Sequence, residues 1–287
     1  MSKHRWTCVI HTQYSAMGKR GESAASSGSA RSAKKPKTAA SGRPLFFIAP
    51  GAGGELAVDK PGEAPRSIKT LLAEIGDVAG PMDKPPMGGG GCSAKALAAF
   101  QTAVEGVCAT HSGRDVWLAT QSFGGRLAVH TTIGGIENRD ATGKPKPWPD
   151  ARPLPGVVKG IIAFGYPLHH AKQDRGAPLL ELPKGTRMMF VMGDRDETAL
   201  GKPVNKALLT SKHYNPLRAA THCLYSTLPL ECSACGCIAD TISKMAASKT
   251  VELLWVPSGG HNPLDTPKTR RAESNAAILQ AVERFIS

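Results

Sequence analysis

Five short apolar segments recur along the chain from residue 45 onward, separated by glycine-rich turns and helical patterns. They cover residues 45–49, 115–119, 157–164, 188–192 and 251–256. Their apolarity is continuous rather than alternating, which predicts strands covered on both faces, as in a parallel sheet flanked by helices. We therefore expect an α/β fold with a mostly parallel central sheet.

Helical patterns lie between the predicted strands and after the last one. They cover residues 67–75, 93–110, 123–133 and 273–285, with Ser93 placed to cap the second one. Residues 81–92, which include four consecutive glycines, and residues 142–155, which include five prolines, are predicted surface loops. Residues 200–249 exceed what a return between two strands needs, so we expect an insertion that covers the site or packs beside it.

Positive charge is concentrated in the first 43 residues. The formal net charge is +13, and this segment contributes +8 through nine Lys or Arg residues against one Glu. Because the segment is also rich in Ser, Ala and Gly, it is predicted to be a disordered basic tail. Residues 44–287 then form one mildly basic domain, and nucleic-acid binding is not expected except through the tail.

Composition also limits the expected location of the protein. No apolar stretch is long enough to cross a bilayer, so no membrane partner is expected. Seven cysteines without a secretory leader indicate a reducing compartment, which favours a cytoplasmic or nuclear protein. Three interpretations of the tail are open: a mitochondrial transit peptide, a nuclear signal around residues 34–37, or a solvated segment with no targeting role.

Ser122 follows the second apolar segment and comes directly before a helical pattern. A serine at a strand-to-helix turn presents its hydroxyl above the sheet edge, next to the amide of the following residue. To react, such a hydroxyl needs an imidazole that takes its proton and a carboxylate that orients the imidazole. Ser122 is therefore a candidate nucleophile, although a serine in a glycine-rich turn is more often only a turn residue.

The last two predicted strands end in residues that fit these partner roles. One runs into Asp194-Arg195-Asp196, and the other runs into Gly259-Gly260-His261. Ligand sites gather at the carboxyl ends of parallel strands, and the chain order Ser, Asp, His is that of the α/β-hydrolase fold. We expect Asp196 to orient His261, since two further residues let it turn off the strand end. Asp194 is expected in a surface ion pair with Arg195.

A glycine-rich turn, Pro50-Gly51-Ala52-Gly53-Gly54, follows the first predicted strand. Its glycines allow a substrate carbonyl to approach the backbone, so the amides of Ala52 and Phe123 are the predicted oxyanion hole. The turn lacks both the dinucleotide-binding glycine pattern and the Lys-Ser/Thr pair of a phosphate loop. We expect no nucleotide and no other cofactor.

Five blocks of the sequence resemble the α/β-hydrolase-like family that includes testis-expressed protein thirty and the third regulatory subunit of the nonspecific-lethal histone acetyltransferase complex. The blocks are residues 49–54, 121–128, 165–169, 190–196 and 256–261. The chain resembles dienelactone-hydrolase-type enzymes more distantly. The resemblance implies the α/β-hydrolase fold, with Ser122, Asp196 and His261 at the triad positions. One branch of the family is a subunit of a chromatin complex, which implies protein partners.

The sequence departs from the family pattern at Thr120, at Pro50 and in its long insertion. Thr120 stands where the first glycine of G-x-S-x-G is expected, and its β-branched side chain is predicted to crowd the turn. Pro50 stands where a histidine often precedes the oxyanion glycine. Two functions are left open. One is a serine hydrolase for a small ester, thioester or related acyl compound, and the other is a catalytically silent scaffold that binds protein partners.

Several other side chains have a chemically reactive or metal-ligating group and also a simpler structural role. Cys232, Cys235 and Cys237, with His222 and Cys223 nearby, provide only one C-x-x-C half, so free or redox-active thiols rather than a zinc site are expected. His169 and His170 follow the third predicted strand, where they either line the pocket or bond to backbone. Arg126 is expected to fix neighbouring carbonyls or carboxylates rather than bind substrate.

Overall fold

The computed structural model of the protein describes residues 42–54, 57–84, 86, 91–139, 145–170, 173–196, 198, 238–246 and 249–287. The basic tail up to residue 41 and most of the insertion predicted at 200–249 lie outside these residues. The domain boundary near residue 44 and the role of the insertion therefore stay predictions.

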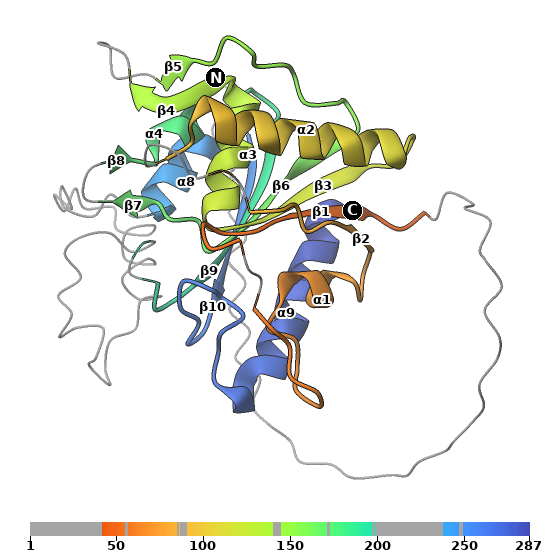
Figure 1. Cartoon of the computed structure of the whole chain (residues 1–287). Coiled ribbons are helices and arrows are strands. Elements are labelled where there is room, and N and C mark those ends of the chain that lie inside the picture. Colours follow the sequence, from red (N-terminus) through yellow and green to blue (C-terminus); the bar gives the residue numbers. More distant parts are fainter. Residues whose placement is uncertain are drawn as a thin grey trace, which may run out of the picture.

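A six-stranded parallel sheet forms the centre of the described part of the chain, in the order β10-β9-β6-β3-β1-β2 (Figure 1). Its strands are β1 (Leu45–Ala49), β2 (Asp77–Ala79), β3 (Val116–Gln121), β6 (Val158–Phe164), β9 (Arg187–Gly193) and β10 (Thr250–Val256). All five predicted strands are confirmed. The additional strand, β2, lies at the sheet edge and is too short to give a periodic signal in the sequence.

Alternate residues of the strands pack into two hydrophobic clusters, one on each face of the sheet. In β1, Leu45, Phe47 and Ala49 belong to one cluster, whereas Phe46 and Ile48 belong to the other. All five side chains are buried. The continuous apolarity of this segment therefore reflects burial on both faces, as predicted.

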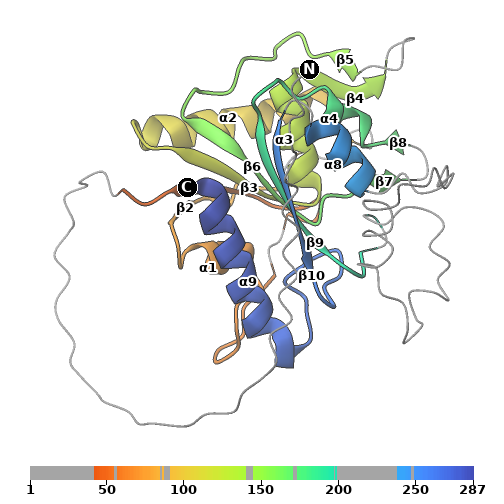
Figure 2. The same ribbon diagram turned by 180° about the vertical axis from the view of Figure 1, so that it is seen from behind.

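Helices cover both faces of the sheet (Figures 1 and 2). One face carries α2 (Ala94–Thr110), α3 (Phe123–Ile133), α4 (Ala177–Leu180) and α8 (Ile238–Ala246), and the other carries α1 (Ile68–Leu72) and α9 (Lys268–Ile286). The Ser93 hydroxyl caps α2 by accepting a hydrogen bond from the Ala96 amide. Helix α9 begins before its predicted start, because its first turn is polar and shows no apolar period. Among the described helices, none has the length and apolarity that a membrane span requires.

Two small antiparallel hairpins lie outside the main sheet. β4 (Gly135–Arg139) pairs with β5 (Pro145–Pro147), and β7 (His169–His170) pairs with β8 (Gln173–Asp174). The predicted loop over residues 142–155 was therefore wrong in part. Prolines are tolerated in a strand that pairs on one side only, because their missing N–H groups can face away from the partner.

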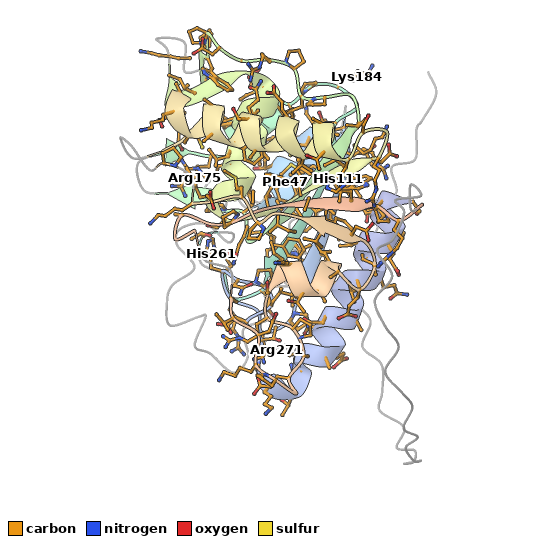
Figure 3. All side chains as sticks on the ribbon, turned by 45° about the vertical axis from the view of Figure 1, so that its right-hand side comes forward. Phe47, His111, Arg175, Lys184, His261 and Arg271 are labelled. Atoms are coloured by element: carbon orange, nitrogen blue, oxygen red, sulfur yellow. The ribbon has the colours of Figure 1, made fainter. Side chains whose placement is uncertain are left out.

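The carboxyl ends of β1, β3, β6, β9 and β10 meet at one edge of the sheet, since all these strands run in the same direction. His261, in the loop after β10, lies on this side of the molecule in Figure 3. His111 and Lys184, which precede β3 and β9, lie on the opposite side. Every residue predicted for the site follows the carboxyl end of a strand.

Candidate active site

Ser122 occupies a sharp turn between β3 and α3. Its backbone has φ 48° and ψ −107°, a positive φ that non-glycine residues rarely adopt. The Ser122 amide donates to the Phe164 carbonyl at the end of β6 (2.9 Å), and the Gly125 amide donates to the Ser122 carbonyl (3.1 Å). These bonds hold the strained turn at the carboxyl edge of the sheet.

Thr120 fits into β3 without displacing this turn. Its side chain is fully buried, and its hydroxyl donates a hydrogen bond to the Ile162 carbonyl on β6 (3.3 Å). Gly125 leaves the necessary room, because a Cβ atom there would lie 3.3 Å from Thr120 Oγ1 and 3.0 Å from the Tyr166 ring. The crowding expected from a β-branched residue at this position is therefore not observed.

The three residues predicted for the triad lie together. His261 Nε2 is 2.7 Å from Ser122 Oγ, and His261 Nδ1 is 3.0 Å from Asp196 Oδ2. The His261 side chain is 43% exposed, whereas that of Asp196 is 1% exposed. Because an ionised carboxylate only accepts hydrogen bonds, Nδ1 carries the ring proton and the Nε2 lone pair faces the Ser122 hydroxyl.

A short turn after β9 holds the Asp196 carboxylate. Asp196 Oδ1 accepts hydrogen bonds from the Thr198 amide (2.8 Å) and from the Thr198 hydroxyl (2.7 Å). The same hydroxyl oxygen lies 3.1 Å from His261 Nδ1. Thr198 was not predicted as a site residue. Its signal in the sequence is the Asp-x-Thr spacing, which lets a hydroxyl and an amide turn back onto the carboxylate.

Asp194, the alternative acid, points to a different partner. Its Oδ1 accepts a hydrogen bond from the Ser258 amide (2.8 Å), and burial raises the pKa of its carboxyl group. Within the described ranges it forms no ion pair with Arg195, so the predicted surface ion pair was wrong. Asp194 instead ties the end of β9 to the loop that leads to His261.

Two glycines leave room for the loop that carries His261. A Cβ atom on Gly165, at the end of β6, would collide with the His261 carbonyl oxygen. A Cβ atom on Gly193, the last residue of β9, would collide with the Gly260 carbonyl oxygen. The loop is also held by a hydrogen bond from the Arg195 amide to the Gly259 carbonyl (2.9 Å). Backbone contacts with two strand ends therefore set the position of His261.

The amides predicted to form the oxyanion hole are placed next to Ser122 in different ways. Phe123 follows it as the first residue of α3, and Ala52 lies in an exposed turn after β1. A Cβ atom on Gly51 would be only 3.5 Å from Ser122 Cβ, so the two turns approach each other closely. No described residue accepts a hydrogen bond from the amide of Ala52 or Phe123. Both are donors with capacity for an oxyanion, and their role stays a prediction.

Arg126 is buried in α3 and forms an ion pair with Glu137 of β4. Glu137 also accepts a hydrogen bond from the Cys92 amide (2.8 Å), and the guanidinium lies 5.3 Å from the centre of the Phe123 ring. Burial raises the pKa of the Cys92 thiol to about 12. Arg126 thus joins the Ser122 helix to β4 and to the start of α2. This carboxylate contact is the kind of partner expected for it.

Metal-ligating side chains do not gather in the part of the chain that the structure covers. There, no group of three or more His, Cys, Asp or Glu residues is arranged to hold an ion. The thiols of Cys232, Cys235 and Cys237 lie outside the described residues, so their role stays a prediction. His169 and His170 form β7, and whether they line a pocket also stays open.

The parallel sheet, the helices on both faces and the Ser122 turn are those of the α/β-hydrolase fold, which confirms the fold predicted from the sequence. A family model described as an alpha/beta hydrolase domain matches residues 92–227, a little under half of the chain. This match includes Ser122 and Asp196 and ends before His261. No curated protein matches the sequence.

Several solved structures are similar to this chain at low sequence identity. An alpha-beta serine hydrolase homologue from Coxiella burnetii is 13% identical with a TM-score of 0.46, covering 83% of this chain and 88% of that one. Thermogutta terrifontis esterase 2, phosphoramylated by tabun, is 14% identical with a TM-score of 0.48, covering 85% and 84%. Dienelactone hydrolase from Anabaena variabilis ATCC 29413 is 11% identical with a TM-score of 0.45, covering 86% of each chain. At this level of similarity, the substrates of these proteins say nothing about the substrate of this chain.

Proposed function

We propose that the protein is a serine hydrolase that cleaves a small ester, thioester or related acyl compound. One observation carries the proposal: a hydrogen-bonded path runs from Ser122 Oγ through the His261 ring to the buried carboxylate of Asp196. A hydroxyl, an imidazole and a carboxylate in this sequence make a serine nucleophilic at neutral pH. The exposed His261 ring also leaves the reacting atoms open to a substrate from solution.

In the proposed reaction, Ser122 Oγ attacks the acyl carbon while His261 Nε2 takes its proton. Asp196 keeps the ring in the required tautomer and stabilises the imidazolium that forms. The carbonyl oxygen becomes negative and is held by the amides of Ala52 and Phe123. His261 then returns the proton to the departing alcohol or thiol, and water hydrolyses the acyl-serine with the same base.

A fluorophosphonate probe tests the proposed nucleophile, because such a probe reacts with an activated serine. The folded protein is expected to be labelled at Ser122, and Ser122→Ala is expected to lose the label. Ser93→Ala is the matched control, since it removes a helix cap at a cost of about 1 kcal/mol and leaves the site intact. Absence of labelling in the unmodified protein, or equal labelling of Ser122→Ala, contradicts the proposal.

The fit of Thr120 leads to a second prediction. Thr120→Gly restores the G-x-S-x-G pattern, yet it is expected to lower the free energy of unfolding by about 1–2 kcal/mol, through the lost hydrogen bond and the glycine in a buried strand. The labelling rate is expected to change by less than about threefold, because the turn is already formed and a threefold change is under 1 kcal/mol. Urea unfolding and probe labelling measure the two effects.

Thr120→Val is the control for this variant, since it keeps the branched shape and removes only the hydroxyl. It is expected to label at the rate of the unmodified protein. A rise of tenfold or more in Thr120→Gly alone would mean that the branched side chain restrains the turn after all.

We further propose kinship with the family branch of testis-expressed protein thirty and the acetyltransferase-complex subunit. Two of the five resembling blocks are the more specific to that family, Ser-x-Gly-Gly-Arg at residues 122–126 and Gly-Tyr-Pro-Leu-His at residues 165–169, and they are neighbours in space, which supports the kinship. Gly125 of the first block packs against the Tyr166 ring of the second, and Gly165 makes room for the His261 loop. The alternative of a silent scaffold with protein partners stays a prediction, and the accommodation of Thr120 removes one reason for it.

A further inference from the structure

We propose that Thr198 is a positioning residue of this site, whose hydroxyl fixes both the Asp196 carboxylate and the His261 ring. The proposal rests on one contact geometry: the Thr198 hydroxyl oxygen lies 2.7 Å from Asp196 Oδ1 and 3.1 Å from His261 Nδ1. The inference deepens the proposed hydrolase and rests on it. Thr198 itself touches no reacting atom, so it acts through the acid and the base.

Burial of Asp196 makes the Thr198 contact necessary. The Asp196 side chain is 1% exposed, and a buried carboxylate oxygen without a donor is costly. Oδ2 receives the His261 ring, whereas the partners of Oδ1 among the described residues are the amide and hydroxyl of Thr198. By holding Oδ1, Thr198 fixes the orientation of the carboxylate. In that orientation Oδ2 points toward His261 Nδ1.

The Thr198 hydroxyl contacts both Asp196 and His261, whereas the Thr198 amide donates only to Asp196. Its proton goes to Asp196 Oδ1, because the ionised carboxylate only accepts. A lone pair of the Thr198 oxygen is then directed at the Nδ1–H of His261, which has two acceptors, at 3.0 Å and 3.1 Å. Two acceptors restrict the rotation of a ring that is 43% exposed.

Two substitutions separate the hydroxyl from the shape of the side chain. Thr198→Val keeps the branched shape and removes the hydroxyl, whereas Thr198→Ser keeps the hydroxyl. We expect Thr198→Val to lower the maximal rate of fluorophosphonate labelling about tenfold, at an unchanged half-saturating probe concentration. Thr198→Ser is expected to stay within about threefold of the unmodified protein. If Thr198 had only a structural role, Thr198→Ser would not restore the labelling rate, and the half-saturating probe concentration would change as well.

A second readout does not depend on the reaction. The Nδ1 proton of His261, held between two acceptors, is expected to give a slowly exchanging downfield proton NMR signal. That signal should be lost or exchange faster in Thr198→Val and persist in Thr198→Ser. The assignment uses Ser122→Ala and His261→Gln as spectral references.

The outcomes separate this proposal from the proposed function. If the unmodified protein is not labelled but its Nδ1 signal depends on the Thr198 hydroxyl, the hydrolase proposal fails and the positioning role stands. If Thr198→Val keeps both the labelling rate and the signal, the positioning role is overturned. Equal losses in the valine and serine variants overturn it as well, since the hydroxyl would then not be the group that matters. Thr198→Ala replaces valine if the valine variant does not fold.

Discussion

Replacing Asp196 with asparagine is expected to lower kcat for hydrolysis of a chromogenic acyl ester by about four orders of magnitude. The asparagine amide fits the space, and its oxygen can still accept the bonds from Thr198. Its NH₂ group then faces His261 Nδ1, which must accept rather than donate. The ring proton moves to Nε2, where it blocks proton transfer from Ser122. Steady-state kinetics and the rate of probe labelling both measure this loss.

Asp194→Asn is the matched control, two residues away on the same turn. Asparagine can still accept the hydrogen bond from the Ser258 amide, so kcat is expected to stay within about fivefold of the unmodified protein, which is about 1 kcal/mol. Similar losses in both variants would mean that the turn as a whole, and not the Asp196 carboxylate, supports the activity. An active Asp196→Asn would contradict the assignment of the acid.

Gly165→Ala is expected to lower kcat/KM by at least about a hundredfold, because it displaces the base without touching the substrate. The added methyl group would overlap the His261 carbonyl oxygen, and that backbone is rigid rather than a flexible side-chain end. The loop must therefore move, and a shift of about 1 Å in a catalytic group is enough for a loss of this size. The labelling rate at Ser122 should fall in parallel.

Gly113→Ala controls for the strain of the substitution itself. Gly113 has φ +79° and Gly165 has φ +59°, so alanine at either position is placed in the left-handed region at a cost of about 1 kcal/mol. Nothing lies within 4 Å of a Cβ atom at Gly113. It precedes β3, at the end of the sheet where His111 is seen in Figure 3, away from His261. Gly165→Ala should lose more stability than Gly113→Ala, because only its methyl group meets backbone, and only Gly165→Ala should lose activity. Equal activity losses would contradict the role of the loop contact.

The parts of the fold that were predictable from the sequence are those with long and consistent patterns. The bounds of β1 (Leu45–Ala49) and α3 (Phe123–Ile133) match the prediction, since an apolar run and a helical period begin and end sharply there. β2 (Asp77–Ala79) has too few residues for any period. β5 (Pro145–Pro147) was hidden by its prolines, because local rules cannot reveal that a strand pairs on one side only.

The candidate site was predictable in its principal groups because each follows a strand end in the order typical of the fold. Thr198 was not, since an Asp-x-Thr spacing is common and gains meaning only when a histidine from another loop lies within reach. A carboxylate partner was expected for Arg126, but its identity, Glu137, was not predictable for a similar reason. Glu137 lies in a polar hairpin, where nothing in the sequence indicates which buried cation it meets. Contacts between distant segments are decided by packing, which local patterns do not encode.

The order of the strands places the two partners of His261 on strands that are not neighbours. Ser122 follows β3 and Asp196 follows β9, and β6 runs between these two strands. Neighbouring strands are about 4.8 Å apart, so the axes of β3 and β9 are roughly 10 Å apart. The two groups lean toward each other, and the His261 ring forms a hydrogen bond to each of them next to Gly165, the residue that follows β6. Two ring nitrogens on opposite edges let one side chain contact a group after β3 and a group after β9 at the same time.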